Sequence, residues 1–281
     1  MVTKNGRKVE ALSKEMLKRY SFSMDQKPLA DRAALITGAS RGIGKGVALN
    51  FAAAGADVLL SARSMADLEE TAAEARKHGV RAETVYMDSY DLDSVNAAVD
   101  AVTERFGKID VLVNNAGGSR NIDGGWLGFR ESTPRIVREL FELNVFSPYF
   151  AAQRAAEAMI EQGHGGSIIN VTSSLADYPS ARIQPYSVAK LAIQEAARLW
   201  AVELGPFKIR VNSIGPGPVE SAQIEKLRVN RPNYDAETVA ATPLGRLGQP
   251  SDIGAAAVFL ASDAAEWISG TSILVAGGRR G

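Results

Sequence analysis

The 281-residue sequence has no cysteine, only two histidines and no net charge. Without cysteine, disulfides, thiolate nucleophiles and cysteine-ligated zinc are excluded, and a reducing cytoplasm is compatible with the composition. Lys+Arg and Asp+Glu both number 32, so no excess charge attracts nucleic acid or an acidic membrane surface. The longest apolar runs, such as Ile253 to Ala261, are about nine residues and too short to cross a bilayer. We therefore expect a cytoplasmic protein that binds neither nucleic acid, membrane nor metal.

The scarcity of histidine also disfavours a serine hydrolase. Such an enzyme needs a base beside its nucleophile. His78 and His164 both lie next to glycines at predicted helix ends, where we expect them to be solvated.

A hydrophobic content of 46% is enough for a large core, and short β-rich runs alternate with helical stretches from Leu29 onward. This alternation predicts an α/β fold, a single doubly wound Rossmann-type domain over residues 29–281 with helices on both faces of a parallel sheet. The seven predicted strands are Ala33–Thr37, Val58–Ser61, Ala82–Met87, Asp110–Asn114, Ser167–Thr172, Ile209–Ile214 and Ser272–Val275.

Residues typical of helix caps mark the ends of the predicted helices. Thr133-Pro134 is typical of an N-cap followed by proline at the first helical position, and Ser64 with Asp67 resembles a capping box. The glycines expected to close helices are Gly55, Gly79, Gly107, Gly163 and Gly205.

Residues 1–28 form a basic N-terminal extension that ends at Pro28. Val9, Leu12, Met16 and Tyr20 recur at helical spacing and predict a short amphipathic helix that docks on the body or on a neighbouring subunit. An organellar transit peptide is a weaker alternative, because the segment contains glutamates.

The first predicted strand runs into a glycine turn that opens a helix. Glycines at this place let the backbone approach a pyrophosphate, whose charge the helix N-terminus stabilises. The predicted dinucleotide-binding residues of this turn are Gly38, Ser40, Arg41, Gly42, Ile43 and Gly44.

The end of the second predicted strand favours NADP(H). An NAD site needs a carboxylate there, and the sequence has Arg63, which with Arg41 suits a 2′-phosphate. The alternative is that both arginines are solvated surface residues. Asp88 either accepts from the adenine amino group or caps a turn, and Asn115-Ala116-Gly117 either lines the ligand crevice or forms a turn.

Tyr186 and Lys190 are one helical turn apart and address one volume. A cation within roughly 5 Å favours a phenolate and lowers its pKa towards neutrality, which predicts acid–base chemistry. Taken alone, the pair is more commonly a packed ring beside a solvated charge.

In the order and spacing of its motifs, the chain from about residue 29 to its end resembles the short-chain dehydrogenase/reductase family, in the branch of the 3-oxoacyl-acyl-carrier-protein reductases. The matching elements are Thr37-Gly38-x-x-x-Gly42-x-Gly44, Asn114 to Gly117, Asn144, Ser173, Tyr186-x-x-x-Lys190, Pro216-Gly217 with Val219, and Pro243 to Pro250.

The resemblance implies roles for four catalytic residues. Tyr186 is expected to be the general acid or base, and Lys190 to lower its pKa and hold the nicotinamide ribose. Ser173 is expected to hydrogen-bond the substrate oxygen, with its neighbour Ser174 as a rival. Asn144 is expected to hold a water on a proton route from Lys190, or alternatively to satisfy a helix irregularity.

The resemblance also implies that the turn after the sixth strand meets the nicotinamide. Ile214 and Val219 would lie against the ring, Pro216 and Gly217 form the cofactor-binding turn between them, and Ser221 would reach the carboxamide; the alternative is a simple strand exit. The last strand departs from the family pattern, because Ala276 stands where an acidic residue usually precedes Gly277-Gly278.

The sequence defines the substrate pocket less closely than it defines the catalytic and cofactor-binding residues. The enlarged loop 118–130 carries Trp126 and Phe129, which either line the pocket or cover the protein's own core. Arg120 or Arg182 could steer an anionic substrate, and an acyl thioester, a sugar or polyol and a small cyclic ketone all remain open.

We thus expect an NADP(H)-dependent oxidoreductase that interconverts a ketone and a secondary alcohol, a small-molecule substrate. The alternatives are an NAD(H)-dependent sugar or polyol dehydrogenase and a non-catalytic dinucleotide-binding regulator. The resemblance further implies a homotetramer packed through helices around 133–161 and 184–204.

Overall fold

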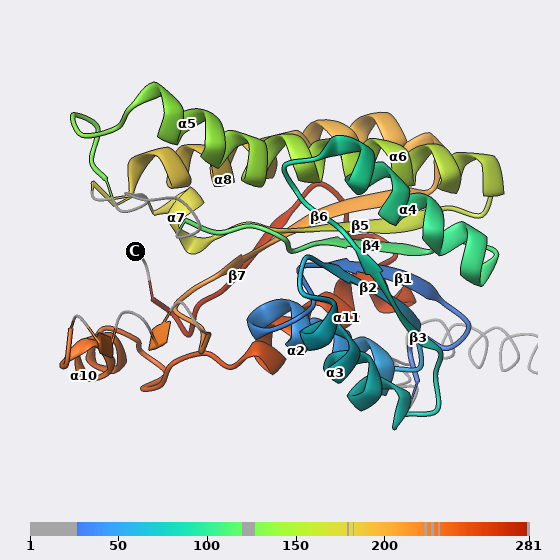
Figure 1. Ribbon diagram of the computed structural model, residues 1–281, viewed down its shortest axis with the longest axis horizontal. Helices are drawn as coiled ribbons and strands as arrows, with labels where there is room; N and C mark the ends of the chain where they lie inside the picture. Colours follow the sequence, from blue (N-terminus) through green and yellow to red (C-terminus); the bar gives the residue numbers. More distant parts are fainter. Residues whose placement is uncertain are drawn as a thin grey trace, which may run out of the picture.

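The computed structural model describes residues 27–119, 127–178, 180–181, 183–221, 224–225, 228–229 and 231–279 (Figure 1). The predicted N-terminal helix lies outside the described residues. So do three side chains considered for the substrate pocket, Arg120, Trp126 and Arg182.

A parallel sheet of seven strands in the order β3-β2-β1-β4-β5-β6-β7 forms the centre of the molecule. The predicted fold class is confirmed, and the strands begin and end within two residues of their predicted bounds. They are β1 (Ala33–Thr37), β2 (Asp57–Ala62), β3 (Ala82–Tyr86), β4 (Val111–Asn114), β5 (Gly166–Val171), β6 (Ile209–Pro216) and β7 (Ser272–Val275).

Helices cover both faces of the sheet, which explains why the central strands read as continuous apolar runs (Figure 1). One face packs against α2 (Gly42–Ala53), α3 (Met65–Arg76) and α11 (Pro250–Ala261). The other packs against α4 (Leu92–Phe106), α6 (Ser147–Gln162) and α8 (Gln184–Leu204). None of the described helices is long and apolar enough to cross a membrane.

Shorter elements lie between these layers or at their edges. They are α5 (Pro134–Phe141), a π-helical turn η1 (Glu142–Phe146), α7 (Ser174–Asp177), the 3₁₀ turns η2 (Gly205–Phe207) and η3 (Asp263–Ala265), and α10 (Tyr234–Ala240).

The helix ends agree only partly with the predicted capping residues. The Thr133 hydroxyl caps α5 by accepting from the Ile136 N–H at 3.3 Å. Ser64 precedes α3 but makes no capping hydrogen bond, so the predicted capping box is wrong. Gly205 does not supply a left-handed closure either; it begins η2, and the left-handed residue is Lys208, with φ of 61°.

Because all strands are parallel, their carboxyl ends meet at one edge of the sheet. The chain order reverses between β1 and β4, which are neighbours in the sheet although two strand–helix units separate them in sequence. Ligands of open α/β sheets bind in the crevice outside such a reversal. The fold therefore places the glycine turn after β1 and the Asn115 segment after β4 at the same crevice.

Candidate active site

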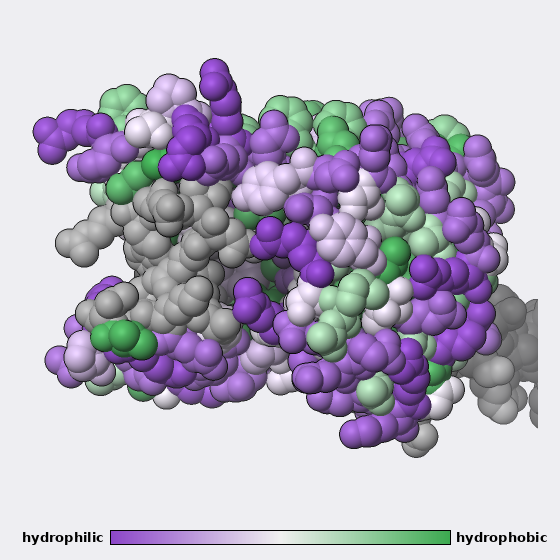
Figure 2. Space-filling view, in the orientation of Figure 1, coloured by the Kyte–Doolittle hydropathy of each residue, from purple (hydrophilic) through white to green (hydrophobic). Residues whose placement is uncertain are grey.

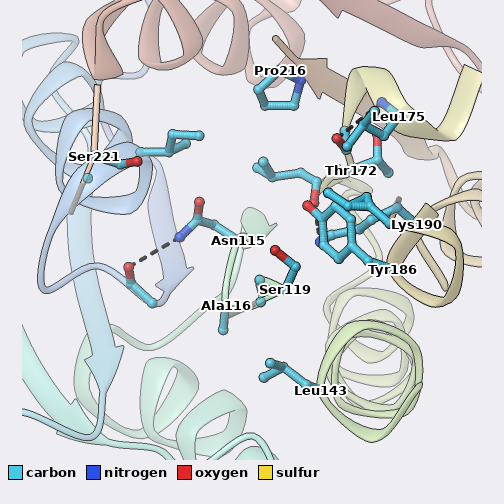
Figure 3. Close-up of a pocket in the computed structure, with 18 of the residues that line it drawn as sticks. Asn115, Ala116, Ser119, Leu143, Thr172, Leu175, Tyr186, Lys190, Pro216 and Ser221 are labelled. Atoms are coloured by element: carbon cyan, nitrogen blue, oxygen red, sulfur yellow. Dashed lines mark hydrogen bonds between the residues drawn. The ribbon is translucent and has the colours of Figure 1, made fainter. Parts of the chain in front are cut away.

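A cleft of about 1410 Å³ opens at the carboxyl ends of the strands. Every predicted cofactor-binding residue lines this cleft. The predicted catalytic residues Tyr186, Lys190 and Ser173 line it too, whereas Asn144 does not. In Figure 3, Tyr186 and Lys190 lie on one side of this cleft, and Asn115 and Ser221 lie on the other. The structure thus gathers residues from positions 38 to 221 around a single volume.

The glycine turn has a shape that requires glycine. Gly38 and Gly42 have positive φ of 67° and 55°. A Cβ on Gly44 would lie 2.2 Å from the Gly38 carbonyl oxygen. Arg41, which precedes α2, makes no side-chain cap. The first N–H groups of α2 are therefore available to an anion, which fits the pyrophosphate of a dinucleotide.

Thr37 and Asn115 brace this turn against the end of β4. The Thr37 hydroxyl accepts from the Asn115 and Ala116 N–H groups at 3.0 and 2.9 Å. The Asn115 amide donates to the Thr37 carbonyl at 2.9 Å. The side chain of Asn115 is thus used to hold the turn in place.

Charged residues surround the end of the cleft near β2 and β3. Arg63 and Arg41 are exposed there, as predicted, and Asp67 and Tyr90 join them. The Asp88 carboxylate accepts from the Tyr90 N–H at 3.1 Å. Asp88 therefore caps a turn, one of its two predicted roles, while it also lines the cleft.

Tyr186, Ser173 and Lys190 meet beyond the end of β5. Tyr186 lies in the first turn of α8, and Lys190 follows one turn later, with its Nζ 5.8 Å from the centre of the tyrosine ring. The Lys190 ammonium donates to the Val171 carbonyl at 2.9 Å. The Ser173 hydroxyl is hydrogen-bonded to the Tyr186 phenol.

Burial governs the acidity of both groups on α8. It raises the pKa of Tyr186 to about 12, and the hydrogen bond from Ser173 opposes this only in part. Burial also lowers the pKa of Lys190 to about 8. The Lys190 ammonium is hydrogen-bonded to Val171, and desolvation is the largest cause of the raised Tyr186 pKa, so a lowering of the phenol pKa by Lys190 stays a prediction.

Ser173 is better placed than its rival Ser174. It precedes α7 in extended backbone, and its oxygen accepts from the Leu175 N–H at 3.2 Å while it also bonds the phenol. Ser174 is the first residue of α7.

Asn144 is fully buried in the π-helical turn η1. Its amide accepts from the Gly118 N–H at 3.0 Å and donates to the Gly118 and Leu140 carbonyls at 3.1 and 3.0 Å. These bonds match the alternative prediction, in which Asn144 satisfies an irregular helix. A water held by Asn144 remains a prediction.

The turn after β6 closes the cleft above Tyr186. The Gly217 N–H donates to the Val275 carbonyl at 3.0 Å, and the Gly248 N–H donates to the Pro218 carbonyl at 3.0 Å. The second bond joins this turn to the Pro243–Pro250 run. Pro216, Gly217, Val219 and Ser221 all line the cleft.

Comparison with known proteins decides the family. The sequence profile described as enoyl-(acyl carrier protein) reductase matches residues 38–280. The 7alpha-hydroxysteroid dehydrogenase of Escherichia coli strain K12 is 37% identical over 92% of this chain and 97% of that protein. The chain belongs to the short-chain dehydrogenase/reductase family. It is therefore related to oxidoreductases that act on CH–OH and C=O groups.

Two further members of the family are informative. The L-rhamnose 1-dehydrogenase (NAD(P)(+)) of Sphingomonas sp. strain SKA58 is 36% identical over 90% of this chain and 97% of its own length. A solved structure of 7 alpha-hydroxysteroid dehydrogenase with NADH and 7-oxo glycochenodeoxycholic acid has a TM-score of 0.86 at 36% identity, covering 93% of this chain and 99% of that chain.

The sequence left the position of Phe129 open, and it did not predict some of the residues that line the cleft. Phe129 is 78% exposed and lines the cleft, so it does not cover the core. Tyr90 and Arg279 line the cleft but were not predicted. Both follow the carboxyl end of a strand, β3 or β7, and that position was the available signal.

Proposed function

We propose that the protein is an NADP(H)-dependent oxidoreductase that interconverts a ketone and a secondary alcohol. The observation that carries the proposal is the meeting of the Tyr186 phenol, the Ser173 hydroxyl and the Lys190 ammonium in the cleft that contains the glycine turn. When bound there, the nicotinamide dinucleotide supplies or accepts the hydride.

Tyr186 is the proton donor in the direction of reduction. With a pKa of about 12 it holds its proton throughout the neutral range, and it can release that proton only to an oxygen that is becoming an alkoxide. Ser173, whose hydroxyl is bonded to the phenol, turns its one proton to the same substrate oxygen and orients the carbonyl. In the direction of oxidation, Tyr186 must first lose its proton, and the phenolate then takes the proton from the alcohol.

The side-chain ends of Lys190 and Asn144 both lie beside Gly117. A Cβ on Gly117 would lie 2.8 Å from Asn144 Oδ1 and 3.0 Å from Lys190 Nζ. Lys190 uses one donor on Val171, and its other two are assigned to the ribose hydroxyls of the cofactor. The same space suits the water proposed beside Asn144.

Arg63 and Arg41 are the basis for choosing NADP(H), because each offers a planar donor set to a 2′-phosphate. The alternative is an NAD(H)-dependent sugar or polyol dehydrogenase. It is favoured by Asp67, which lines the same end of the cleft, by the relative solved with NADH, and by the rhamnose dehydrogenase that accepts either cofactor.

The test of the proposed reaction is NADPH consumption with a panel of ketones. Tyr186→Phe is expected to lose about 10²- to 10⁴-fold in kcat/KM, the usual contribution of a positioned acid. Tyr86→Phe is the matched control, because Tyr86 is exposed on β3 and lies outside the cleft lining. Equal rates for wild type and Tyr186→Phe would eliminate the role assigned to Tyr186. No turnover of any ketone would favour a non-catalytic dinucleotide-binding protein.

The cofactor is tested separately by equilibrium binding. Arg63→Ala is expected to weaken NADPH by roughly 10-fold or more and to leave NADH nearly unchanged, since only the 2′-phosphate loses its partner. Equal losses for both nucleotides would contradict the choice of NADP(H).

We also propose a homotetramer formed through α6 and α8, in the cytoplasm. Exposed apolar side chains on and next to these helices support it, including Phe146, Tyr149, Leu199 and Val202. Hydrophobic atoms gather along the upper edge in Figure 2, over the same helices. The alanines of α6 do not contribute, because Ala151, Ala152, Ala155 and Ala156 are buried against the sheet.

A further inference from the structure

We propose that Gln194 is a positioning residue, which holds the chain on both sides of Ser173 against α8. This helix also carries Tyr186 and Lys190. The proposal rests on the proposed function, since it assigns the geometry of that site to a side chain outside it. Neither Gln194 nor its partner Asp177 lines the cleft. An effect of either residue on turnover must therefore pass through residues that do.

Gln194 extends the row of side chains that begins at Tyr186. It lies one helical turn after Lys190, just as Lys190 lies one turn after Tyr186, so the three side chains follow one side of α8. Gln194 is only 1% exposed. Burying an amide is unfavourable unless its polar ends are hydrogen-bonded, and a fully bonded amide fixes the segments that it joins.

The donor end of the amide holds the residues after Ser173. Gln194 Nε2 donates to Asp177 Oδ1 at 2.7 Å. An ionised carboxylate accepts and cannot donate, so the NH₂ group of the amide must face Asp177. Asp177 is the last residue of α7, which begins directly after Ser173. A single helical turn has little stability of its own, so this bond determines where the turn lies.

The acceptor end of the amide faces the strands on the other side of Ser173. Gln194 Oε1 accepts from the Ser272 hydroxyl of β7 at 3.0 Å and lies 3.5 Å from the Thr172 hydroxyl. Thr172, the residue before Ser173, donates its hydroxyl proton to the Ile214 carbonyl of β6 at 3.0 Å. Both neighbouring segments of Ser173 are thus held against one buried side chain.

This arrangement keeps the Ser173 hydroxyl beside the Tyr186 phenol. The two groups are hydrogen-bonded, and Thr172 lies on the same side of the cleft as Tyr186 and Lys190 (Figure 3). Both hydroxyls must reach one substrate oxygen. If the Ser173 segment moved away from α8, that geometry would be lost, and a displacement of about 1 Å can cost roughly 10²-fold in rate.

Double-mutant kinetics separates positioning from stability. Gln194→Leu is expected to lower kcat in the ketone assay by roughly 10- to 100-fold and to leave the Kd for NADPH unchanged. In a Ser173→Ala background, the same substitution is expected to lower kcat by less than about 3-fold, because the group that it positions is already absent. An equal fold-loss of kcat in both backgrounds would overturn the proposal.

Gln162→Leu is the matched control for this experiment. The Gln162 amide accepts from the Ile109 N–H at 2.8 Å and donates to the Ile109 and Ala158 carbonyls at 3.2 and 2.9 Å, just before the start of β4. Its loss should lower the free energy of unfolding and leave kcat at the wild-type value. A comparable fall of kcat in Gln162→Leu would show that general destabilisation explains both variants.

Asp177 provides a milder pair of variants, since it is exposed and its replacement is compatible with folding. Asp177→Asn keeps an oxygen that accepts from Gln194 and is expected to retain most of the wild-type kcat. Asp177→Ala has no such oxygen, so its kcat should approach that of Gln194→Leu. Wild-type kcat in Asp177→Ala would contradict the anchoring of α7.

Hydrogen exchange of backbone amides gives an answer that does not depend on turnover. The Ala176 and Tyr178 N–H groups close α7 by donating to the Ser173 and Ser174 carbonyls at 3.0 and 2.9 Å. They are expected to exchange faster in Gln194→Leu than in wild type, and at the wild-type rate in Gln162→Leu. If this difference is seen although no ketone reacts, the proposed reaction fails and the anchoring stands. Equal exchange in wild type and Gln194→Leu overturns the anchoring.

Discussion

At the scale of single residues, the shifted pKa values of Tyr186 and Lys190 suit two different tasks in the proposed reaction, proton donation and cofactor binding. Burial makes the phenol a weaker acid and the ammonium a stronger one, so both shifts favour the neutral forms. A tyrosine that keeps its proton is ready to protonate a carbonyl oxygen. Lysine, in contrast, has the charge needed to hold hydroxyl groups only below its lowered pKa.

A pH dependence follows from the lysine. Reductive kcat/KM is expected to be level near neutrality and to fall as pH rises through about 8, because Lys190 then loses its proton. Lys190→Arg keeps its charge over this range, so its profile should lack that fall, whatever its absolute rate. The measurement is the pH profile of NADPH oxidation at saturating cofactor, and a fall near pH 8 that persists in Lys190→Arg would contradict the assignment.

Gly117 gives a second prediction at this scale. Gly117→Ala places a methyl group within 3.0 Å of both Asn144 Oδ1 and Lys190 Nζ, so one of them must move. We expect roughly a 10- to 100-fold loss in kcat/KM, since a displacement of about 1 Å can cost that much. Gly205→Ala is the control, because a Cβ there has nothing within 4 Å. Unchanged kinetics in Gly117→Ala would show that this space is not used.

At the scale of elements, the π-helical turn η1 is the irregular part of an otherwise regular site. A wider helical turn frees a carbonyl from its usual partner, and Asn144 donates to that of Leu140 while it also holds both backbone groups of Gly118. The side chain therefore ties the helix to the loop after β4. Its buried bonds make it a structural brace as well as a neighbour of Lys190.

Replacing Asn144 should lower the free energy of unfolding. Asn144→Ala leaves several buried backbone groups without a partner, and we expect a loss of about 2–4 kcal/mol in the free energy of unfolding. Asn50→Ala is the comparison, since within the described part of the chain the Asn50 amide donates to one carbonyl, that of Gly46, and about 1 kcal/mol is expected. Urea denaturation measures both, and an Asn144 variant that is no less stable than the Asn50 variant would refute the bracing role.

At the scale of the whole molecule, α8 carries apolar side chains that are exposed to solvent in a single chain. Leu199 and Val202 are 72% and 80% exposed. Burying such side chains against another copy stabilises an oligomer at about 25 cal/mol per Å² of apolar surface.

Charged substitutions on this surface of α8 are expected to change the oligomeric state and to leave the fold unchanged. The double variant Leu199→Glu with Val202→Glu is expected to lower the mass measured by light scattering after gel filtration, while its circular dichroism is retained. Met65→Glu, on the first turn of α3, adds a similar charge away from this surface and should keep the wild-type mass. A wild type that runs as a monomer, or a double variant of unchanged mass, would contradict an interface through α8.

The local patterns of the sequence are enough for the fold and for many of the residues that line the cleft, though not for Tyr90 and Arg279. Strand–helix alternation predicts the sheet, and the glycines at 38, 42 and 44 predict a tight turn, in which a Cβ on Gly38 or Gly44 would clash with backbone atoms. Capping was less predictable. Thr133 caps its helix and Ser64 does not; the backbone ψ is 156° at Thr133 and 97° at Ser64, so the two hydroxyl residues enter their helices in different conformations.

The sequence by itself determined which side chains stand at the carboxyl ends of the strands, because alternation and spacing are local properties of the chain. Only the tertiary structure decided the sign of the Tyr186 pKa shift, the engagement of Asn144 with Gly118, and the arrival of Arg279 in the cleft. Each depends on desolvation or on contacts between segments far apart in sequence. Such effects are set by packing, which no single stretch of residues contains.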